Sequence, residues 1–294
     1  MTRNHFYAAL VLTAAFAAQN TRAASNNRVL EAANAGTILP QAAPVIEDLG
    51  DLRPLDDKPL MNRLHITATT KGEFVSNARL IGKHGSSDFL FMPSVTADFV
   101  QPLQHGFSLD LNARAESFMY ARFNQYSFWG FSGAATVNYQ HSEKWPVFYV
   151  SAEPYWYNSV TTGRQLGSAI AVSTGVERTW VCNRDRTVFF AGYNFSCFGA
   201  SPSADNRNLH RATVGVTHQL RPAWYTQLYY SFQFSDFRGA GREDYRNLVG
   251  LNLVHTINAN WSANISTTFV NNNSTNATAT YQNFTAGAGL SFHY

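Results

Sequence analysis

The stretch "KHGSSD" holds the side chains that come nearest to a catalytic group, namely His84, Ser86, Ser87 and Asp88. A serine hydroxyl activated by a histidine and oriented by a carboxylate is the arrangement of many hydrolases. Here the four residues are almost contiguous within a polar loop, and no nucleophile motif accompanies them on a strand face. The sequence therefore favours a protein that is not an enzyme.

Metal and cofactor sites are not expected either. His210 and His218 lie eight residues apart, too far for one strand to bring both onto a single metal ion, and the chain has no zinc spacing and no phosphate-binding glycine loop. Cys182 is expected beside the tight turn that follows segment 165–182, and Cys197 at the far end of the next segment, 186–198. The two are then separated by about ten residues or 30 Å, whereas a disulfide needs Cα atoms within about 7 Å. We expect no disulfide and no bound cofactor.

A second set of chemically active residues is charged and recurs at every second position. In "FSLDLNARAES", Phe107 and Leu109 share one face of an extended chain, while Asp110, Arg114 and Glu116 share the other. A period of two is typical of a β-strand whose two faces meet different surroundings. Strands of this kind must position the charged groups.

The alternation continues from Leu64 to Tyr294 and predicts twelve strands, although ten or fourteen also fit the pattern. The predicted strands span 64–76, 87–102, 106–121, 126–141, 146–159, 165–182, 186–198, 208–220, 223–237, 244–257, 260–272 and 280–294. Soluble sheets usually have strands of about five or six residues. Strands this long suit a tilted crossing of a membrane.

The connections between these strands alternate in length. Tight links such as "PLQHG", "LRPA" and "INAN" alternate with longer polar ones such as "NARLIGKHGSSD" and "FGASPSADNRN". Outer-membrane barrels have short periplasmic turns and longer external loops, and closure leaves no unpaired strand edge in the bilayer. The sequence predicts an all-β fold, a transmembrane up-and-down antiparallel β-barrel of about 12 strands with both termini on the periplasmic side.

The tryptophans are expected at the two membrane interfaces. Four lie beside or within tight links and two lie near the longer loops, which would form two aromatic girdles. The expected girdle residues are Trp129, Trp145, Trp156, Trp180, Trp224 and Trp261.

The strand face opposite the apolar one is expected to line the lumen. Acidic residues predominate on the predicted strands 2–6 and arginines on strands 8–10, so the two walls would face each other. The expected lumen and selectivity residues are Asp98, Asp110, Arg114, Glu116, Glu153, Glu177, Arg211 and Arg246. Two interpretations remain open: a transverse field that orients polar solutes, and a network of salt bridges that stiffens a small barrel.

Three features fit the alternation poorly. Pro93 and Pro154 fall inside predicted strands, where each removes a ladder hydrogen bond, and a β-bulge near each would accommodate it. Arg178 is expected on the outer face near the periplasmic interface. The segment 186–198 is apolar on both faces and has no clear register.

The N-terminal region differs from the barrel. Arg3 followed by "FYAALVLTAAFAA" predicts a secretory signal peptide over 1–23, and the Pro-, Ala- and Asp-rich segment 24–62 is expected to be a periplasmic linker or plug before a barrel domain over 63–294. The small net charge of +3 with scattered basic residues gives no support for nucleic-acid binding. Export through the periplasm to the bacterial outer membrane is expected.

The chain ends in "NFTAGAGLSFHY", with Leu290, Phe292 and Tyr294 on the apolar face. A terminal strand that closes on an aromatic residue resembles the outer-membrane β-barrel proteins of Gram-negative bacteria, specifically the porin-like group. The resemblance implies that these three residues are an assembly signal for the barrel-assembly machinery, and that outer-membrane lipids and small polar solutes are partners. Tyrosine here replaces the commoner phenylalanine.

These observations predict a narrow passive channel for small polar or ionic solutes. One alternative is a non-conducting structural, surface or assembly barrel that binds a partner through its loops or its N-terminal segment. Another is an enzyme similar to the outer-membrane phospholipases, which resemble this chain in size and strand number and use a Ser–His–Asn arrangement with calcium.

Overall fold

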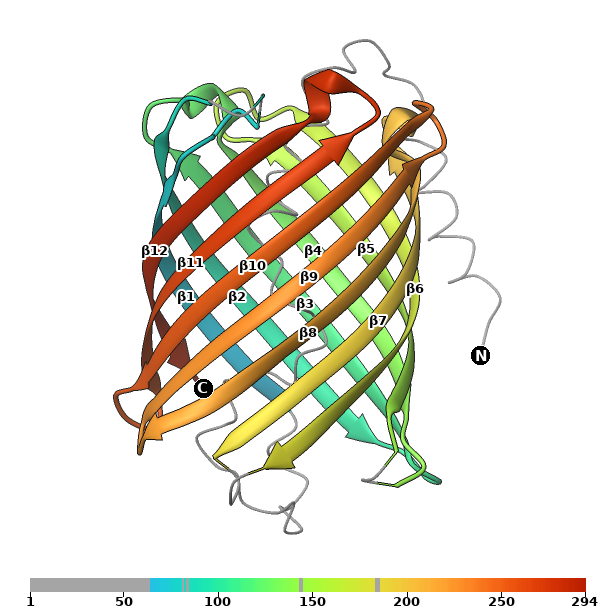
Figure 1. The fold of residues 1–294 in the computed structure, drawn as a ribbon, viewed down its shortest axis with the longest axis vertical. Helices are drawn as coiled ribbons and strands as arrows, with labels where there is room; N and C mark the ends of the chain where they lie inside the picture. Colours follow the sequence, from blue (N-terminus) through green and yellow to red (C-terminus); the bar gives the residue numbers. More distant parts are fainter. Residues whose placement is uncertain (1–63, 81, 83–84, 143–144, 183–185) are drawn as a thin grey trace.

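The computed structural model describes residues 64–80, 82, 85–142, 145–182 and 186–294, which form one closed barrel of antiparallel strands (Figure 1). The strands are β1 (Leu64–Val75), β2 (Asp88–Pro102), β3 (Phe107–Tyr120), β4 (Phe128–Tyr139), β5 (Val147–Ser159), β6 (Gln165–Cys182), β7 (Thr187–Ser201), β8 (Arg207–Arg221), β9 (Trp224–Phe237), β10 (Arg242–Thr256), β11 (Trp261–Ser274) and β12 (Tyr281–His293). The predicted strand number is confirmed, and no predicted strand end differs from the structure by more than three residues. The predicted signal peptide and linker lie outside the described residues.

Each strand pairs with its neighbours in the sequence, and β12 pairs with β1 to close the barrel. At this seam Ile66 and Tyr294 exchange two backbone hydrogen bonds, of 3.0 and 2.9 Å. The described residues include no helix long and apolar enough to cross a membrane.

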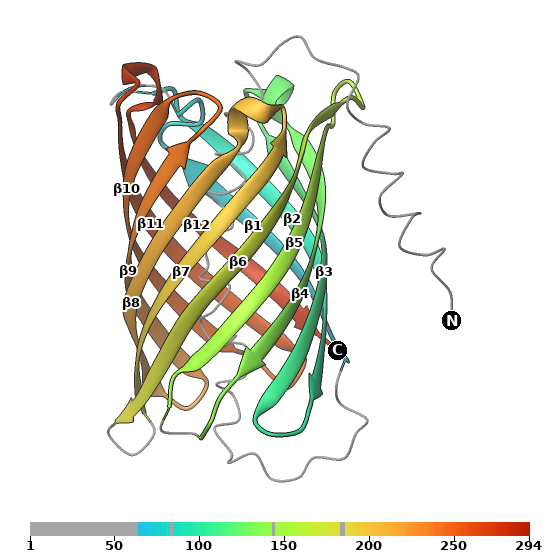
Figure 2. The ribbon, with the colours of Figure 1, turned by 90° about the vertical axis from the view of Figure 1, so that its right-hand side faces the viewer.

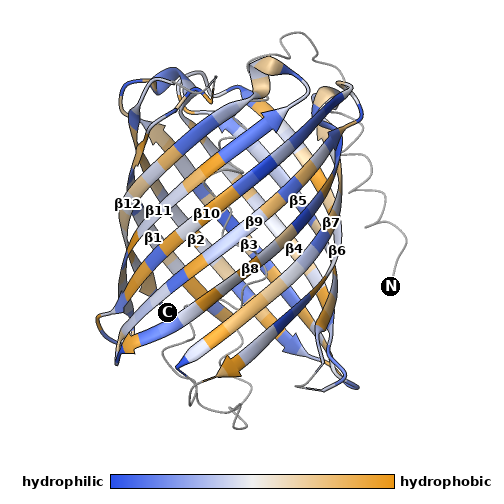
Figure 3. Cartoon of the chain, viewed as in Figure 1, coloured by the Kyte–Doolittle hydropathy of each residue, from blue (hydrophilic) through white to orange (hydrophobic). Residues whose placement is uncertain are grey.

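The period of two separates an apolar outer face from a mixed inner face, as the alternating colours along the strands show (Figure 3). Side chains such as Leu64, Val95, Leu228 and Ile265 point outward and are 50 to 59% exposed. Their inward neighbours are largely polar or half-buried. So large an exposed apolar surface is stable only in contact with lipid.

Tight turns occupy one end of the barrel and longer connections the other (Figure 2). Three of the longer connections contain single 3₁₀ turns, η2 (Asn124–Tyr126), η3 (Ser203–Asp205) and η4 (Ala277–Ala279). At the opposite end the C-terminus lies beside the β10–β11 turn, where the amide of His293 donates to the carbonyl of Asn260. The predicted alternation holds only in part, because the connections at the loop end span 4 to 12 residues and those at the turn end span 2 to 7.

The β-bulges expected near the two prolines do not occur. The pairing of β2 with β3 lapses at Met92 and Pro93 and resumes in the same register, and the pairing of β4 with β5 does the same around Pro154. Each proline keeps its neighbour on one side, opposite Thr70 or Ile170. The loss of one ladder hydrogen bond is thus absorbed without an inserted residue.

The register shifts that do occur lie elsewhere and near strand ends. One falls between Tyr157 and Asn158 in the β5–β6 pairing, and the other between Gln219 and Arg221 in the β8–β9 pairing. Strand β7 has a regular register, with Phe189 and Tyr193 outward and Phe190 buried inside. Its two apolar faces arise because the interior of the barrel is itself partly apolar.

Two apolar clusters occupy the inside of the barrel. The first cluster, on β1–β5 near the longer loops, consists of Val75, Ala78, Leu90, Phe118, Tyr120, Phe128 and Tyr157. The second cluster consists of Leu80, Phe190, Tyr229, Leu248, Val270 and Tyr281. These side chains narrow the lumen and leave the charged groups between them.

Candidate functional site

The charged residues predicted for the lumen all alternate with lipid-facing side chains and therefore lie on the inner face. Their strands are β2 for Asp98, β3 for Asp110, Arg114 and Glu116, β5 for Glu153, β6 for Glu177, β8 for Arg211 and β10 for Arg246. Lys71 and Glu73 share the inner face of β1.

The carboxylates of the acidic wall mostly accept hydrogen bonds from neighbouring side chains. The side-chain amide of Asn112 donates to Asp98 at 2.5 Å, and that of Asn138 donates to Asp110 at 2.6 Å. Glu153 accepts hydrogen bonds from the hydroxyls of Ser151, at 2.9 Å, and Tyr155. These hydrogen bonds occupy carboxylate lone pairs that a solute would otherwise use.

The ion pairs run along strands and do not cross the lumen. The three pairs among the described residues are Lys71–Glu73 at 2.7 Å, Arg114–Glu116 at 2.9 Å and Arg242–Asp244 at 3.0 Å. Each joins residues two positions apart on one strand, because such neighbours share a face. Among the residues that the structure describes, the predicted stiffening network is therefore present only within each wall.

The arginine wall is larger than the sequence analysis predicted. Arg207 and Arg242 begin β8 and β10 on the inner face, four residues before Arg211 and Arg246. Both were missed because the predicted strands began after them. Counting back in steps of two from Arg211 and Arg246 would have found them.

A row of stacked aromatic and cationic groups crosses four strands of this wall. Phe198, Arg207, Phe237 and Arg242 are successive cross-strand neighbours on β7, β8, β9 and β10. The Arg207 guanidinium lies 4.5 Å from the Phe198 ring centroid and 5.2 Å from that of Phe237, and the Arg242 guanidinium lies 3.9 Å from that of Phe237. Such contacts hold buried guanidiniums in place.

A second row runs parallel to the first and contains the other two arginines. Arg211 on β8 and Arg246 on β10 both lie opposite Gln233 on β9. The row ends at Asn194 on β7, opposite Arg211, and at Asn272 on β11, opposite Arg246. Arg246 is only 5% exposed. Its Nε and Nη2 atoms, and the Nε of Arg211, are buried and make no hydrogen bond within the described part of the chain.

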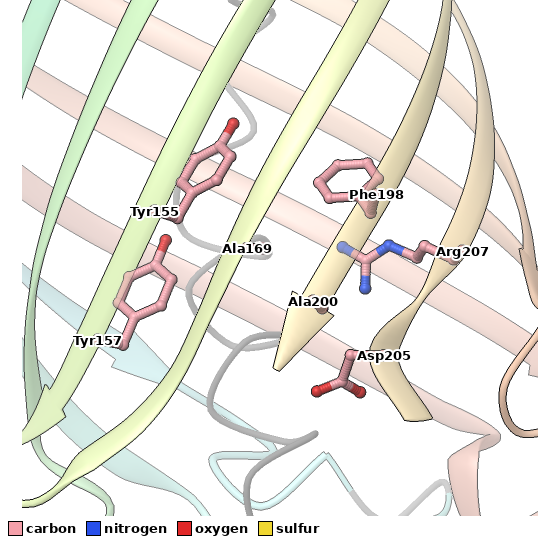
Figure 4. A pocket seen from close by; sticks show the side chains of 7 residues that line it. All are labelled: Tyr155, Tyr157, Ala169, Phe198, Ala200, Asp205 and Arg207. Carbon is pink, nitrogen blue, oxygen red and sulfur yellow. The ribbon is translucent and has the colours of Figure 1, made fainter. Parts of the chain in front are cut away.

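Two small pockets open beside these rows. The first is lined by Tyr155, Tyr157, Ala169, Phe198, Ala200, Asp205 and Arg207 (Figure 4). The second is lined by Arg207, Gln233, Ser235, Phe237, Asp244, Arg246, Asn272 and Tyr281. Arg207 lines both, so the pockets are adjacent.

The inward tyrosines line or flank this region. Tyr149, Tyr155 and Tyr157 lie on the inner face of β5, and the hydroxyl of Tyr149 accepts from Asn194 at 2.9 Å. Tyr225 and Tyr229 lie inward on β9. Arg211 interacts electrostatically with Glu153 on β5 as well as with Arg246 on β10. The acidic and basic walls therefore face one another at this level.

The remaining predicted residues lie on the outside of the barrel. The six tryptophans are 38 to 54% exposed, and Arg178 stacks on Trp180 with 5.3 Å between guanidinium and ring centroid. On β12, Leu290 and Phe292 point outward, and Tyr294 is 82% exposed. Cys182 and Cys197 are unbridged; Cys182 lies opposite Thr187, ten residues from Cys197 along β7, a distance of about 33 Å.

The loop that could have been catalytic has a structural role at Asp88. Its carboxylate accepts hydrogen bonds from the amides of Phe89, Arg122 and Phe123, at 2.7 to 2.9 Å, and so anchors the β3–β4 loop to the start of β2. His84 lies outside the described residues. Within the described ranges, no three His, Cys, Asp or Glu side chains converge where they could hold a metal ion.

Comparison with known proteins finds a family match over part of the chain and a shared fold. Residues 180–294 match the sequence model of a family described as putative beta-barrel porin 2. A search of the curated proteins finds no match. The family match and the fold together confirm the resemblance to porin-like outer-membrane β-barrels.

Several solved barrels are similar in structure. An outer-membrane channel from Pseudomonas putida F1 is 9% identical, with 83% of this chain and 100% of that chain covered and a TM-score of 0.54. The translocator domain of the autotransporter NalP from Neisseria meningitidis is 11% identical and has a TM-score of 0.49. The alignment covers 92% of this chain and 99% of that domain. At 9% identity the likeness to the Pseudomonas putida channel shows the fold alone.

Proposed function

We propose that this protein is a narrow passive channel of the bacterial outer membrane for small polar or ionic solutes. The observation that carries the proposal is the inner arginine wall, in which Arg211 and Arg246 face the lumen without a salt-bridge partner among the described residues. A barrel that only needed internal stiffness would pair these charges, because an unpaired buried charge costs stability.

The membrane location rests on the outer face. Large apolar residues cover it, and six tryptophans are exposed there, which fits a lipid-facing band with aromatic girdles. The predicted signal peptide supports export through the periplasm. Outer-membrane lipids and the barrel-assembly machinery are the partners this location implies.

A non-conducting barrel is the second candidate, and the two internal apolar clusters favour it. Phe118, Phe128 and Tyr157 are at most 4% exposed inside the first cluster. Packing of this kind stabilises a barrel whether or not solutes pass. The two candidates differ in whether a continuous aqueous path remains beside the clusters.

Planar-bilayer recording of the refolded mature chain separates the two candidates. We expect discrete, stable conductance steps that persist when residues 25–60 are deleted. The matched comparison is Ser235→Trp, which places a large side chain in the second pocket. This variant should reduce the size of the conductance steps. No conductance in either the full mature chain or the deletion variant would support the non-conducting barrel.

A further inference from the structure

We propose that Arg211 and Arg246 form a binding subsite for the oxyanion group, a carboxylate or phosphate, of a small solute inside the barrel. The subsite deepens the proposed channel function and rests on it for its biological role. Its occupancy, however, can be measured without any conductance.

The first support is the state of the two guanidiniums. Arg246 is only 5% exposed and lines the second pocket. Its Nε and Nη2 atoms are buried and have no hydrogen-bond partner in the described barrel. The Nε atom of Arg211 is buried and unpartnered in the same way. Arginine cannot relieve this by losing its proton. Buried charges in proteins are normally paired, so the arrangement lacks an anion.

The second support is the geometry of the row. Both arginines lie opposite Gln233, and strands are about 4.8 Å apart, so their backbones are separated by about 10 Å. Two side chains of this length converge readily on one group. Arg211 also feels the positive charge of Arg246, and the two would repel each other in the absence of an anion.

The third support is that the nearby carboxylates already have donors. Asp244 is 3.0 Å from Arg242, Glu153 accepts from Ser151 and Tyr155, and Glu73 is held by Lys71 at 2.7 Å and Thr285 at 3.2 Å. Glu153 contributes a long-range attraction to Arg211 but forms no ion pair with it in the described chain. Asp244 keeps one buried oxygen without a hydrogen-bond partner, but among the described residues its ion pair is with Arg242, and no carboxylate forms an ion pair with Arg211 or Arg246.

The second pocket provides the rest of a small-solute site. Its lining combines the guanidiniums of Arg207 and Arg246 with the neutral groups of Gln233, Ser235 and Asn272 and the rings of Phe237 and Tyr281. The carboxylate of Asp244, paired with Arg242, also lines it. Guanidiniums bind carboxylate and phosphate oxygens with two parallel hydrogen bonds, which makes an oxyanion the expected occupant.

Titration calorimetry of the refolded protein in detergent, with sodium phosphate at constant ionic strength, tests the subsite. We expect saturable binding that weakens about tenfold or more in Arg246→Gln and in Arg211→Gln, because each charge-assisted pair is strong. Arg178→Gln removes the same charge from the outer face and should leave the affinity within about twofold. Sodium acetate in a parallel titration distinguishes a carboxylate from a phosphate preference.

Two controls distinguish the loss of anion binding from the loss of folding: the variant Arg246→Lys and thermal unfolding of every variant. The lysine variant retains the charge but not the planar guanidinium, so it should bind phosphate more weakly than the wild type and more tightly than Arg246→Gln. Every variant should show the same thermal unfolding transition as the wild type. No saturable binding of either anion, or equal losses in Arg178→Gln, would overturn the subsite. Conductance without anion binding would refute the subsite alone, and binding without conductance would refute the channel alone.

Discussion

Single residues determine how closely neighbouring strands of this barrel approach each other. A Cβ added at Gly250 would lie 2.3 Å from the ring of Tyr229, and one added at Gly175 would lie 2.4 Å from the hydroxyl of Tyr149. Each glycine is directly opposite its aromatic partner on the adjacent strand. The aromatic ring covers the glycine and fills the space that a side chain would otherwise take.

Gly250→Ala is therefore expected to destabilise the barrel. The new methyl group forces Tyr229 away from its position in the second apolar cluster, and overpacking of this kind costs about 1 to 3 kcal/mol. Urea unfolding of the protein in lipid vesicles measures the change. The control is Gly199→Ala, since nothing lies within 4 Å of a Cβ there. Equal stability of the two variants would contradict the close packing.

The residues of the arginine region were predictable only in part. Arg211 and Arg246 follow from the period of two, and Arg207 and Arg242 follow from the same period once the strand starts are known. The stack of Phe198, Arg207, Phe237 and Arg242 depends on the register between four strands. One sequence read strand by strand does not determine that register, because turns and bulges set it.

Among the elements, β12 closes the barrel and carries the expected assembly signal. Tyr294 is 82% exposed, yet its backbone amide and carbonyl both bond to Ile66. The ring and the backbone of Tyr294 therefore have different roles. The ring is free for recognition, whereas the backbone completes the seam with β1.

Tyr294→Ala is expected to slow assembly in cells severalfold while leaving the stability of the folded barrel within about 1 kcal/mol, because the substitution preserves both backbone hydrogen bonds. Pulse-chase measurement of folded barrel in outer membranes gives the rate, and urea unfolding gives the stability. Tyr294→Phe retains the ring and should assemble like the wild type. Normal assembly of the alanine variant would show that the ring is not the signal.

The elements were predicted well where one face meets lipid, and poorly where both faces are apolar. Along β9, Leu228 and Tyr230 alternate with buried Gln227 and Ser231, and the contrast between faces located the strand. In β7 the inward Phe190 belongs to an internal apolar cluster, so the contrast disappears. No bulge is needed at Pro93 or Pro154, because the ladder tolerates a local gap in pairing.

For the whole molecule, the decisive feature is a lumen with charges of opposite sign on facing walls. Strands 2–6 contribute carboxylates that are mostly bound by neighbours, and strands 8–10 contribute four arginines, of which Arg211 and Arg246 form no ion pair with the described residues. Composition and alternation predicted this division of charge. The internal apolar clusters were not predicted, because apolar residues on the inner face resemble noise in the alternation.

The reversal potential of single channels in a tenfold KCl gradient tests the central claim most directly, since it reports which charges the permeating ions meet. Arg211→Gln combined with Arg246→Gln should shift it toward cation selectivity by about 10 mV or more, out of a possible ~59 mV in either direction. Glu177→Gln, on the opposite inner wall, should shift it toward anions. Arg178→Gln on the outer face should not change it. Unchanged reversal potentials in the double arginine variant would contradict the claim that ions pass along this wall.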